Sequence, residues 1–246
     1  MKVFVAGATG STGKHLVNFL LQQGHQVVAV VRSIDRVPPE VRSHENLELV
    51  QASLLDLTDQ ELKNLVAGCG AVASCLGHDM TFQGMFGQPR LLVTEAVRRL
   101  CQAIIASDNS REVKVRFVLM NTVGNRNRDL DETIAFKEKL VIGIMRLLLP
   151  PQRDNERAPE YLRTEIGRDH PVLEWTAVRP ASLIDQETVS EYSLHQSPLQ
   201  SAIFGVGTTS RINVAHFMAV LISDNALWKK WKGHMPVIYN KSIQNK

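Results

Sequence analysis

The stretch Met1–Gly24, MKVFVAGATGSTGKHLVNFLLQQG, decides the fold. Its apolar run over residues 2–6 is typical of a strand that is buried on both faces of a sheet. The turn GATGSTG follows over residues 7–13, and after it apolar residues recur at helical spacing. Gly24 stands where a glycine commonly ends a helix. The expected order is therefore strand, glycine turn and helix.

Each of the three glycines in the turn has its own physical reason. Gly7 permits a tight exit from the strand, Gly10 lets the backbone approach a pyrophosphate without a Cβ in between, and Gly13 lets the helix pack close to the sheet. A helix that begins near Ser11 points its unpaired N–H groups at the phosphates. The alternative is a tight turn that binds nothing, but such a turn needs one glycine and not three in register. The stretch therefore predicts a dinucleotide site.

Composition argues against several other classes of protein. The chain has 246 residues, 44% of them hydrophobic, without a linker or charge run, so we expect one domain over residues 1–246. The net charge is +3 and the basic residues are scattered, which argues against a nucleic-acid partner. Cys69, Cys75 and Cys101 lack metal-ligand spacing and are expected to be reduced core residues. No metal site is predicted.

The sequence also argues against a membrane partner. Its most apolar helical stretch, over residues 140–149, is too short to span a bilayer and contains Arg146. The first strand begins so early that we expect no N-terminal signal before it. A cytoplasmic protein is the expectation.

Apolar runs alternate with helical patterns along the rest of the chain. Strands are predicted over residues 25–32, 47–52, 71–76, 113–120, 173–179 and 236–240. Helices are predicted from Thr58 or Asp59, over 89–106, from Asp129 or Asp131 to Leu149 before Pro150-Pro151, and over 155–167 and 214–222. The predicted fold class is α/β, a Rossmann-like doubly wound parallel sheet with a small C-terminal substrate-side region, whose loops lie mainly at 182–210.

The end of the second strand predicts the type of dinucleotide. In this fold an acid at that position binds the ribose hydroxyl of NAD, whereas an arginine nearby accommodates the 2′-phosphate of NADP. Here Arg32 and Ser33 occupy the position, Arg36 follows, and no acid comes before Asp35. A guanidinium binds phosphate through paired, charge-assisted hydrogen bonds. We predict NADP(H) over NAD(H); the alternative is that Arg32 is an ordinary solvated residue.

The chain resembles the short-chain dehydrogenase/reductase superfamily, and within it the atypical, NmrA-like group of NAD(P)-binding proteins. The resemblance spans residues 1 to 222. The motifs that carry it are Gly7–Gly13, Leu76-Gly77, Phe117–Gly124, Trp175–Pro180 and Ser210–Asn213.

The resemblance implies a set of residues that line the cofactor. It implies Thr9, Ser11 and Thr12 at the pyrophosphate, Arg32 and Ser33 at the adenosine phosphate, Leu76 and Gly77 at the ribose, Asn121 and Thr122 on the nicotinamide side, and Pro180 and Ala181 at the carboxamide. The adenine end departs from the pattern. Where the family often has an Asp after the third strand, this chain has Ser53, which leaves Leu54 to contact adenine.

The chemistry departs further from the family pattern. Active members use a tyrosine with a lysine four residues later, which lowers the pKa of the phenol. Here the residues four positions after Tyr161, Tyr192 and Tyr239 are Glu, Gln and Ile. Thr122 either occupies the serine position of the family or only caps a backbone group. The other groups considered for proton transfer, none of them assigned as catalytic, are Lys137, Lys139, His78-Asp79 and His195.

Two functions remain open from the sequence. The first is an NADPH-dependent reductase whose planar acceptor, such as a flavin or quinone, needs positioning more than acid catalysis. An apolar cluster of Met80, Phe82, Met85 and Phe86 would contact this acceptor. The alternative is that the cluster only anchors its loop to the core. The second is a regulatory or assembly protein that responds to NADP(H) through a protein partner. A sugar-nucleotide or isoprenoid-modifying enzyme is disfavoured, since such enzymes usually keep the tyrosine.

Overall fold

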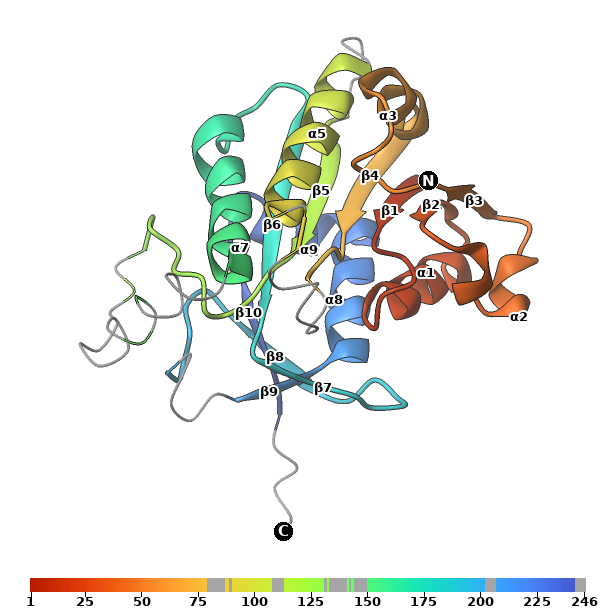
Figure 1. Cartoon of the computed structure of the whole chain (residues 1–246). Coiled ribbons are helices and arrows are strands. Elements are labelled where there is room, and N and C mark those ends of the chain that lie inside the picture. The colour runs from red at the N-terminus through yellow and green to blue at the C-terminus, as the bar shows by residue number, and fades with distance from the viewer. Residues whose placement is uncertain are drawn as a thin grey trace.

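The computed structural model describes residues 1–78, 87–88, 90–107, 113–130, 132, 141, 143, 150–201 and 207–241. Its centre is a sheet in which eight strands of the described chain follow the order β3-β2-β1-β4-β5-β6-β10-β8 (Figure 1). The strands are β1 (Lys2–Ala6), β2 (Gln26–Val31), β3 (Leu47–Gln51), β4 (Cys69–Ser74), β5 (Val115–Met120), β6 (Leu173–Pro180), β8 (Tyr192–His195) and β10 (Val237–Asn240).

The strand order is that of a doubly wound fold. The neighbours from β3 to β6 are all parallel, and β10 adds a further parallel strand beside β6. The last strand, β8, is antiparallel to β10. The chain therefore reverses its direction of travel across the sheet at β1, and beside this switch point the carboxyl ends of β1 and β4 leave room for a ligand. The predicted Rossmann-like α/β fold class is confirmed.

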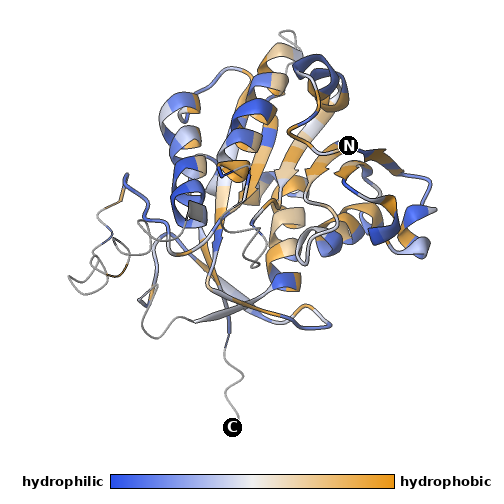
Figure 2. Cartoon of the chain, in the orientation of Figure 1, coloured by the Kyte–Doolittle hydropathy of each residue, from blue (hydrophilic) through white to orange (hydrophobic). Residues whose placement is uncertain are grey.

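Helices bury both faces of the sheet, and the central strands β1, β2 and β4 are mostly apolar (Figure 2). On one face lie α3 (Asp59–Val66), α5 (Leu92–Ser107) and α7 (Pro150–Tyr161), and on the other lie α1 (Gly13–Gln22), α8 (Arg211–Ser223) and α9 (Asn225–Trp231). In β1, for example, Phe4 lies in the core with the first group of helices, while Val3 and Val5 lie in the core with the second group. This burial on both faces explains why the sequence of β1 is a continuous apolar run.

Helix ends follow the signals in the sequence at several places. α1 ends at Gln22, two residues before Gly24, whose φ is +75°, and the His25 N–H donates to the Leu20 carbonyl at 3.0 Å. α3 begins after Thr58, where the Thr58 hydroxyl accepts from the Glu61 N–H and the Glu61 carboxylate accepts from the Thr58 N–H. The first helix begins at Gly13, slightly later than Ser11, although the Lys14 N–H already bonds to the Gly10 carbonyl at 3.1 Å.

Some elements differ from the predictions. The helix predicted over 155–167 begins at Pro150, because prolines need no intrahelical N–H bond in the first turn, and it passes into a π-helical turn, η2 (Leu162–Ile166). The region 182–210 contains two short paired strands, β7 (Ser182–Ile184) and β9 (Thr208–Ser210), as well as β8. Such short strands carry too few residues for a clear period. The helix predicted to end at Leu149 lies almost wholly outside the described residues.

Two short helices separate β2 from β3. They are η1 (Ile34–Arg36) and α2 (Pro39–Arg42), where the sequence over 38–46 predicts a loop or a poorly formed helix. Among the described residues, no helix is long and apolar enough to cross a membrane.

A buried ion pair joins the end of β6 to the segment after β5. The guanidinium of Arg179 is fully buried and donates to both carboxylate oxygens of Glu132, at 2.8 and 3.0 Å. Its remaining donors bond to the carbonyls of Asn125, Gln196 and Met235, at 2.7 to 2.9 Å. All five N–H donors of this arginine therefore have acceptors, as a charge in a dry interior requires.

Candidate functional site

The glycine turn brings three parts of the backbone into close contact. Gly7 has a φ of +78°, and a Cβ at this position would lie 2.8 Å from the Cys75 carbonyl group. A Cβ at Gly13 would lie 2.1 Å from the Gly7 oxygen. Any larger residue at Gly7 or Gly13 would therefore push β1, the turn and β4 apart.

Gly10 differs from the other two glycines of the turn. Its N–H donates to the Gly7 carbonyl at 3.0 Å, and a Cβ built on it would meet nothing nearer than the Gly7 oxygen, at 3.2 Å. The fold therefore tolerates a methyl group here better than at Gly13. A smooth, open backbone surface at Gly10 is what the predicted approach of a pyrophosphate requires.

A cavity of about 410 Å³ lies at the carboxyl ends of β1 to β4, and we call it the strand-tip cavity. Half of the predicted site residues line it, namely Gly7, Thr9, Gly10, Arg32, Ser53, Leu54, Leu76 and Gly77. They come from four separate strand ends, and the parallel sheet brings those ends together at one edge. The volume is within the range of sites for small organic ligands.

The other predicted residues do not line the strand-tip cavity. Thr12 and Gly13 are buried at the start of α1, Ser11 is exposed beside them, and Ser33 is half-buried after β2. The four residues predicted for the nicotinamide side, Asn121, Thr122, Pro180 and Ala181, lie together at the tips of β5 and β6. There the Val123 N–H donates to the Pro180 carbonyl at 2.9 Å.

The charge of the strand-tip cavity is mainly positive. Arg32 and Arg36 both line it, and Asp56 is the acid among the lining residues. Asp35, the first acid after β2, does not line it and has an ion pair with Arg42 at 3.6 Å. The two arginines at the end of β2 are therefore the cations best placed for an anionic ligand.

Sequence reasoning missed several lining residues. Arg36 was noted but not placed in the site, and Asp56, Cys75, Gln88 and Leu92 were not considered as ligand contacts. Asp56 comes three residues after Ser53 and places a carboxylate at the cavity in the loop after β3. The position of Asp56 shortly after a strand was the signal that could have identified it as a lining residue.

A buried carboxylate connects three elements near this edge of the sheet. Asp154 on α7 is fully buried and accepts the N–H groups of Val93 and Thr94 at 2.7 and 2.8 Å, which caps the first turn of α5. The Asp154 carboxylate also lies 2.7 Å from Nε2 of His78, a residue just after β4. Burial acts to raise the pKa of Asp154, but the hydrogen bonds from His78, Thr94 and Val93 outweigh it and hold the pKa below its ordinary value.

The next residue of α7 anchors the tip of β5. Pro159 has no N–H, so it cannot bond to the carbonyl of Asn155 one turn earlier. That carbonyl accepts the side-chain amides of Asn121, at 2.9 Å, and Asn125 instead. The Asn125 amide also donates to the Asn121 side chain. A proline within a helix thus fixes the orientation of Asn121, one of the predicted site residues.

Burial works against a lowered pKa in each of the three tyrosines. Burial raises the pKa of Tyr161, Tyr192 and Tyr239 above the ordinary value. The Tyr192 hydroxyl pairs with Nδ1 of His216 at 2.9 Å, between α8 and β8. A catalytic tyrosine requires the opposite shift of its pKa.

The remaining predicted groups have other environments. His195 on β8 pairs with the Ser193 hydroxyl at 2.9 Å. Cys69 and Cys101 are buried, and burial raises the pKa of Cys75 to about 12. Asp79, Lys137, Lys139 and the cluster Met80, Phe82, Met85 and Phe86 lie outside the described residues. Among the described residues, no group of three His, Cys, Asp or Glu side chains could hold a metal ion.

The fold and the strand-tip cavity define a Rossmann-like protein of the dinucleotide-binding class. Residues 7–225 match the model of a protein family described as NAD(P)H-binding. The chain belongs to this NAD(P)H-binding family. The predicted membership in a group of NAD(P)-binding proteins is confirmed.

Known proteins with a similar sequence or structure agree with this class. An uncharacterised chloroplastic protein of Arabidopsis thaliana is 41% identical over 59 residues, which are 24% of this chain and 21% of that protein. An oxidoreductase from Lactococcus lactis is similar with a TM-score of 0.68 and 21% identity, over 98% of this chain and 92% of that one.

Two further solved structures have the same fold. A short-chain dehydrogenase/reductase from Veillonella parvula, in complex with NADP, has a TM-score of 0.70 and 15% identity over 98% of this chain and 95% of that one. A candidate NADH-flavin reductase from Streptococcus pneumoniae has a TM-score of 0.67 and 21% identity over 98% of this chain and all of that one. At these low identities the likeness is one of fold.

Proposed function

We propose that the chain is an NADPH-dependent oxidoreductase that transfers hydride to a planar acceptor such as a flavin or quinone. The observation that carries the proposal is the strand-tip cavity, where the glycine turn faces two arginines at the end of β2. The name of one similar structure, an NADP complex, agrees with the proposed cofactor, and the name of another, a candidate NADH-flavin reductase, agrees with the proposed acceptor. The cofactor is the dinucleotide, and the natural acceptor is a small molecule of conjugated structure.

The residues of the cavity fit a dinucleotide phosphate. In the proposal Thr9 and Gly10 border the pyrophosphate together with Ser11, Thr12 and Gly13 at the start of α1. Arg32 binds the 2′-phosphate with Arg36 beside it, and Ser33 flanks them. Leu76 and Gly77 border the ribose, and Ser53 and Leu54 border adenine. Asn121, Thr122, Pro180 and Ala181 form the nicotinamide side.

The chemistry of a conjugated acceptor suits this chain. The reduced cofactor supplies the hydride, and the acceptor spreads the arriving charge over its own π-system. The protein then needs to hold the two rings in contact and exclude competing reactions, and solvent provides the proton. The raised pKa values of the three tyrosines, and the absence of a lysine four residues after any of them, are consistent with such a reaction.

A second function is a regulatory or assembly protein that binds NADP(H) without turning it over. It is favoured by Asp154, which precedes the Asn155 that contacts Asn121, because this carboxylate is fully buried and committed to three partners. A carboxylate so occupied is poorly suited to exchange protons with a substrate. Such a protein needs different affinities for NADPH and NADP, or for a partner with and without cofactor.

The test begins with calorimetric titration of the purified chain with NADPH, NADP, NADH and NAD. Oxidation of bound NADPH is then followed by absorbance after addition of a flavin or a quinone. The proposal predicts tighter binding of the phosphorylated pair and acceptor-dependent oxidation. Tight binding without oxidation by any acceptor would support the regulatory function instead. Binding of none of the four dinucleotides would contradict both.

A further inference from the structure

A second cavity lies on the opposite face of the sheet from the strand-tip cavity. It has a volume of about 200 Å³ and lies between α1, residues 36–41 and the strands β2 and β3. Successive residues of a strand point to opposite faces, so Ala29 of β2 lines this cavity whereas Val30 lines the strand-tip cavity. Thr9 and Arg36 line both. We call this second cavity the α1 cavity.

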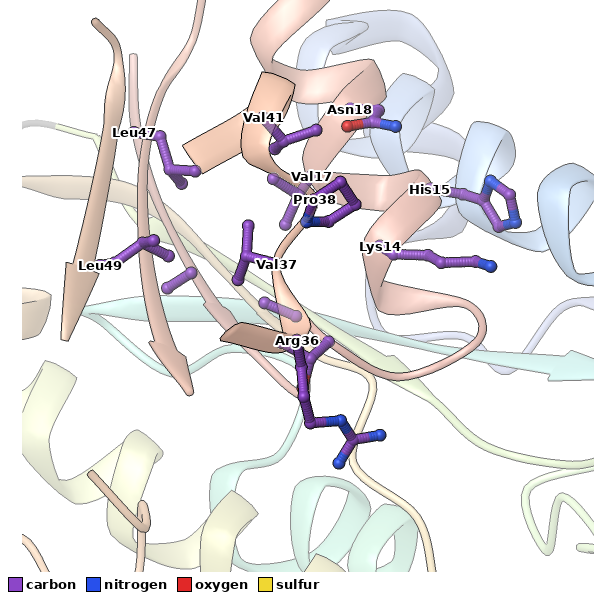
Figure 3. A pocket seen from close by; sticks show the side chains of 13 residues that line it. Lys14, His15, Val17, Asn18, Arg36, Val37, Pro38, Val41, Leu47 and Leu49 are labelled. Atoms are coloured by element: carbon purple, nitrogen blue, oxygen red, sulfur yellow. The ribbon is translucent and has the colours of Figure 1, made fainter. Parts of the chain in front are cut away.

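The interior of the α1 cavity is apolar. Figure 3 shows its side chains, which include Val17, Val37, Val41, Leu47 and Leu49. Protein cores leave few voids larger than a water molecule, so an opening of this size between a helix and a sheet is uncommon. A dry cavity of roughly 150 Å³ with a similar lining binds benzene. The α1 cavity is therefore large enough for one six-membered ring with a small substituent.

The rim of the α1 cavity is basic. Lys14, His15 and Arg36 line it, and no Asp or Glu does. Lys14 and Arg36 are exposed, and Figure 3 shows their side chains extending outward from the apolar centre. Neither makes an ion pair with another described residue. Burial and the Lys14 charge lower the pKa of His15, against the opposing effect of Asp185, so this ring is mainly a neutral hydrogen-bonding group at neutral pH.

We propose that the α1 cavity is a second ligand site, which takes a small aromatic carboxylate with its ring among Val17, Val37 and Leu49 and its carboxylate at Lys14 and Arg36. An apolar interior selects the ring, and two cations that make no ion pair with another described residue select the anion. A neutral ring lacks the second contact and a small aliphatic acid lacks the first. Arg36 is shared with the proposed 2′-phosphate contact, but the site needs no bound dinucleotide and can be tested without one.

The experiment is a titration of the full chain, without dinucleotide, with benzoate, benzyl alcohol and acetate. Binding is followed through the methyl NMR signals of valine and leucine residues. We expect saturable shifts for Val17, Val37 and Leu49 with benzoate, weaker binding of benzyl alcohol, and no saturation with acetate. Val30 and Leu54, which line the strand-tip cavity, report binding at the wrong place.

Two pairs of variants separate the ring from the charge. Lys14→Gln removes a cation from the rim and is expected to raise the dissociation constant of benzoate about three- to tenfold, whereas Lys63→Gln, on α3 and not among the lining residues, leaves it unchanged. Leu49→Phe fills the interior and is expected to abolish binding. Val50→Phe is its control, since Val50 is the next residue of β3 and packs against the other face.

These measurements can support or overturn the proposal even without the Leu49→Phe variant. Shifts at Val17, Val37 and Leu49, together with weaker benzoate binding in Lys14→Gln alone, support it even if Leu49→Phe fails to fold. The proposal is overturned by the absence of saturable shifts, or by shifts centred on Val30 and Leu54. Equal affinity for benzoate and benzyl alcohol, with no effect of Lys14→Gln, would equally overturn it.

Discussion

Two regions at the same edge of the sheet are built in opposite ways. The glycine turn over residues 7–13 is held by backbone contacts. They join residues that are close together in the sequence, and they also connect the turn to the end of β4. The turn of α7 at Asp154 and Asn155 is made of side-chain contacts to His78, Val93 and Asn121, which lie 34 to 76 residues away in the chain. The first region depends on the smallest side chain, and the second depends on particular polar groups. Substitutions therefore affect them differently.

The largest effect is expected at Gly13. In Gly13→Ala the new Cβ would lie 2.1 Å from the Gly7 oxygen, and backbone cannot move aside as a flexible side chain can. We expect a loss of more than about 4 kcal/mol in the free energy of unfolding, or no folded protein. Denaturant unfolding followed by circular dichroism measures it.

Gly10→Ala is the matched control for that variant. A Cβ at Gly10 meets only one atom, at 3.2 Å, so the variant is expected to fold. Its expected defect is weaker dinucleotide binding, because the added methyl group covers the proposed pyrophosphate surface. If Gly10→Ala were as unstable as Gly13→Ala, the distinction between a folding glycine and a binding glycine would be wrong.

The second largest effect is expected at Asp154. Asp154→Ala leaves the N–H groups of Val93 and Thr94 buried without their acceptor, and each such group costs about 1 to 3 kcal/mol. We expect unfolding to become easier by about 2 to 5 kcal/mol. In Asp59→Ala, which removes an exposed carboxylate paired with Arg99, the change should be less than about 1 kcal/mol. Similar losses in both variants would contradict the capping role of Asp154.

The stabilising effect of Asp154 should also depend on pH. Its pKa in the folded chain lies below the ordinary value of 3.8, so the ionised form favours the folded state. The contribution is complete above the unfolded-state pKa and is lost as the pH falls through the lower folded-state pKa. The difference in unfolding free energy between the natural chain and Asp154→Asn should therefore shrink below about pH 4. A difference that grows on acidification would refute this assignment.

The smallest effect is expected at Pro159. Replacing a proline within a helix usually restores one backbone hydrogen bond and relieves a clash, together about 3 kcal/mol. Here the freed carbonyl of Asn155 already accepts two side-chain amides, so Pro159→Ala should gain less than about 1 kcal/mol. Thermal unfolding measures the gain. A stabilisation near the usual value would show that the asparagine contacts contribute little.

The same contrast explains how much the sequence could predict. The order strand, glycine turn and helix, the Gly24 helix end and the Thr58 cap depend on neighbouring residues, and the structure confirms them. The capping of α5 by Asp154 depends on residues about 60 positions apart, and no local pattern carries that information. Pro150 and Pro151 illustrate a related difficulty, since a proline pair stops one helix and starts another equally well.

Within the candidate site, too, the sequence predicted local features and missed those that depend on distant residues. Gly7, Thr9 and Gly10 of the glycine turn line one cavity together with residues at the ends of β2 to β4, and the position of each after a strand was the signal. Arg36 and Gln88 come from connecting segments whose path no periodicity defines. The α1 cavity could not be predicted, because it results from how closely α1 and residues 36–41 pack on the sheet. The assignment of individual residues to parts of the cofactor remains a proposal.

The most direct test of the account measures dissociation constants for NADPH and NADH in the natural chain, Arg32→Ala and Arg36→Ala. Arg42→Ala is the control, since Arg42 pairs with Asp35 and does not line the strand-tip cavity. We predict that loss of Arg32 weakens NADPH binding by about 1.5 to 3 kcal/mol and leaves NADH binding nearly unchanged, with a smaller selective loss for Arg36→Ala. Equal losses for both cofactors, or no loss for either, would contradict the assignment of this cavity to NADP(H).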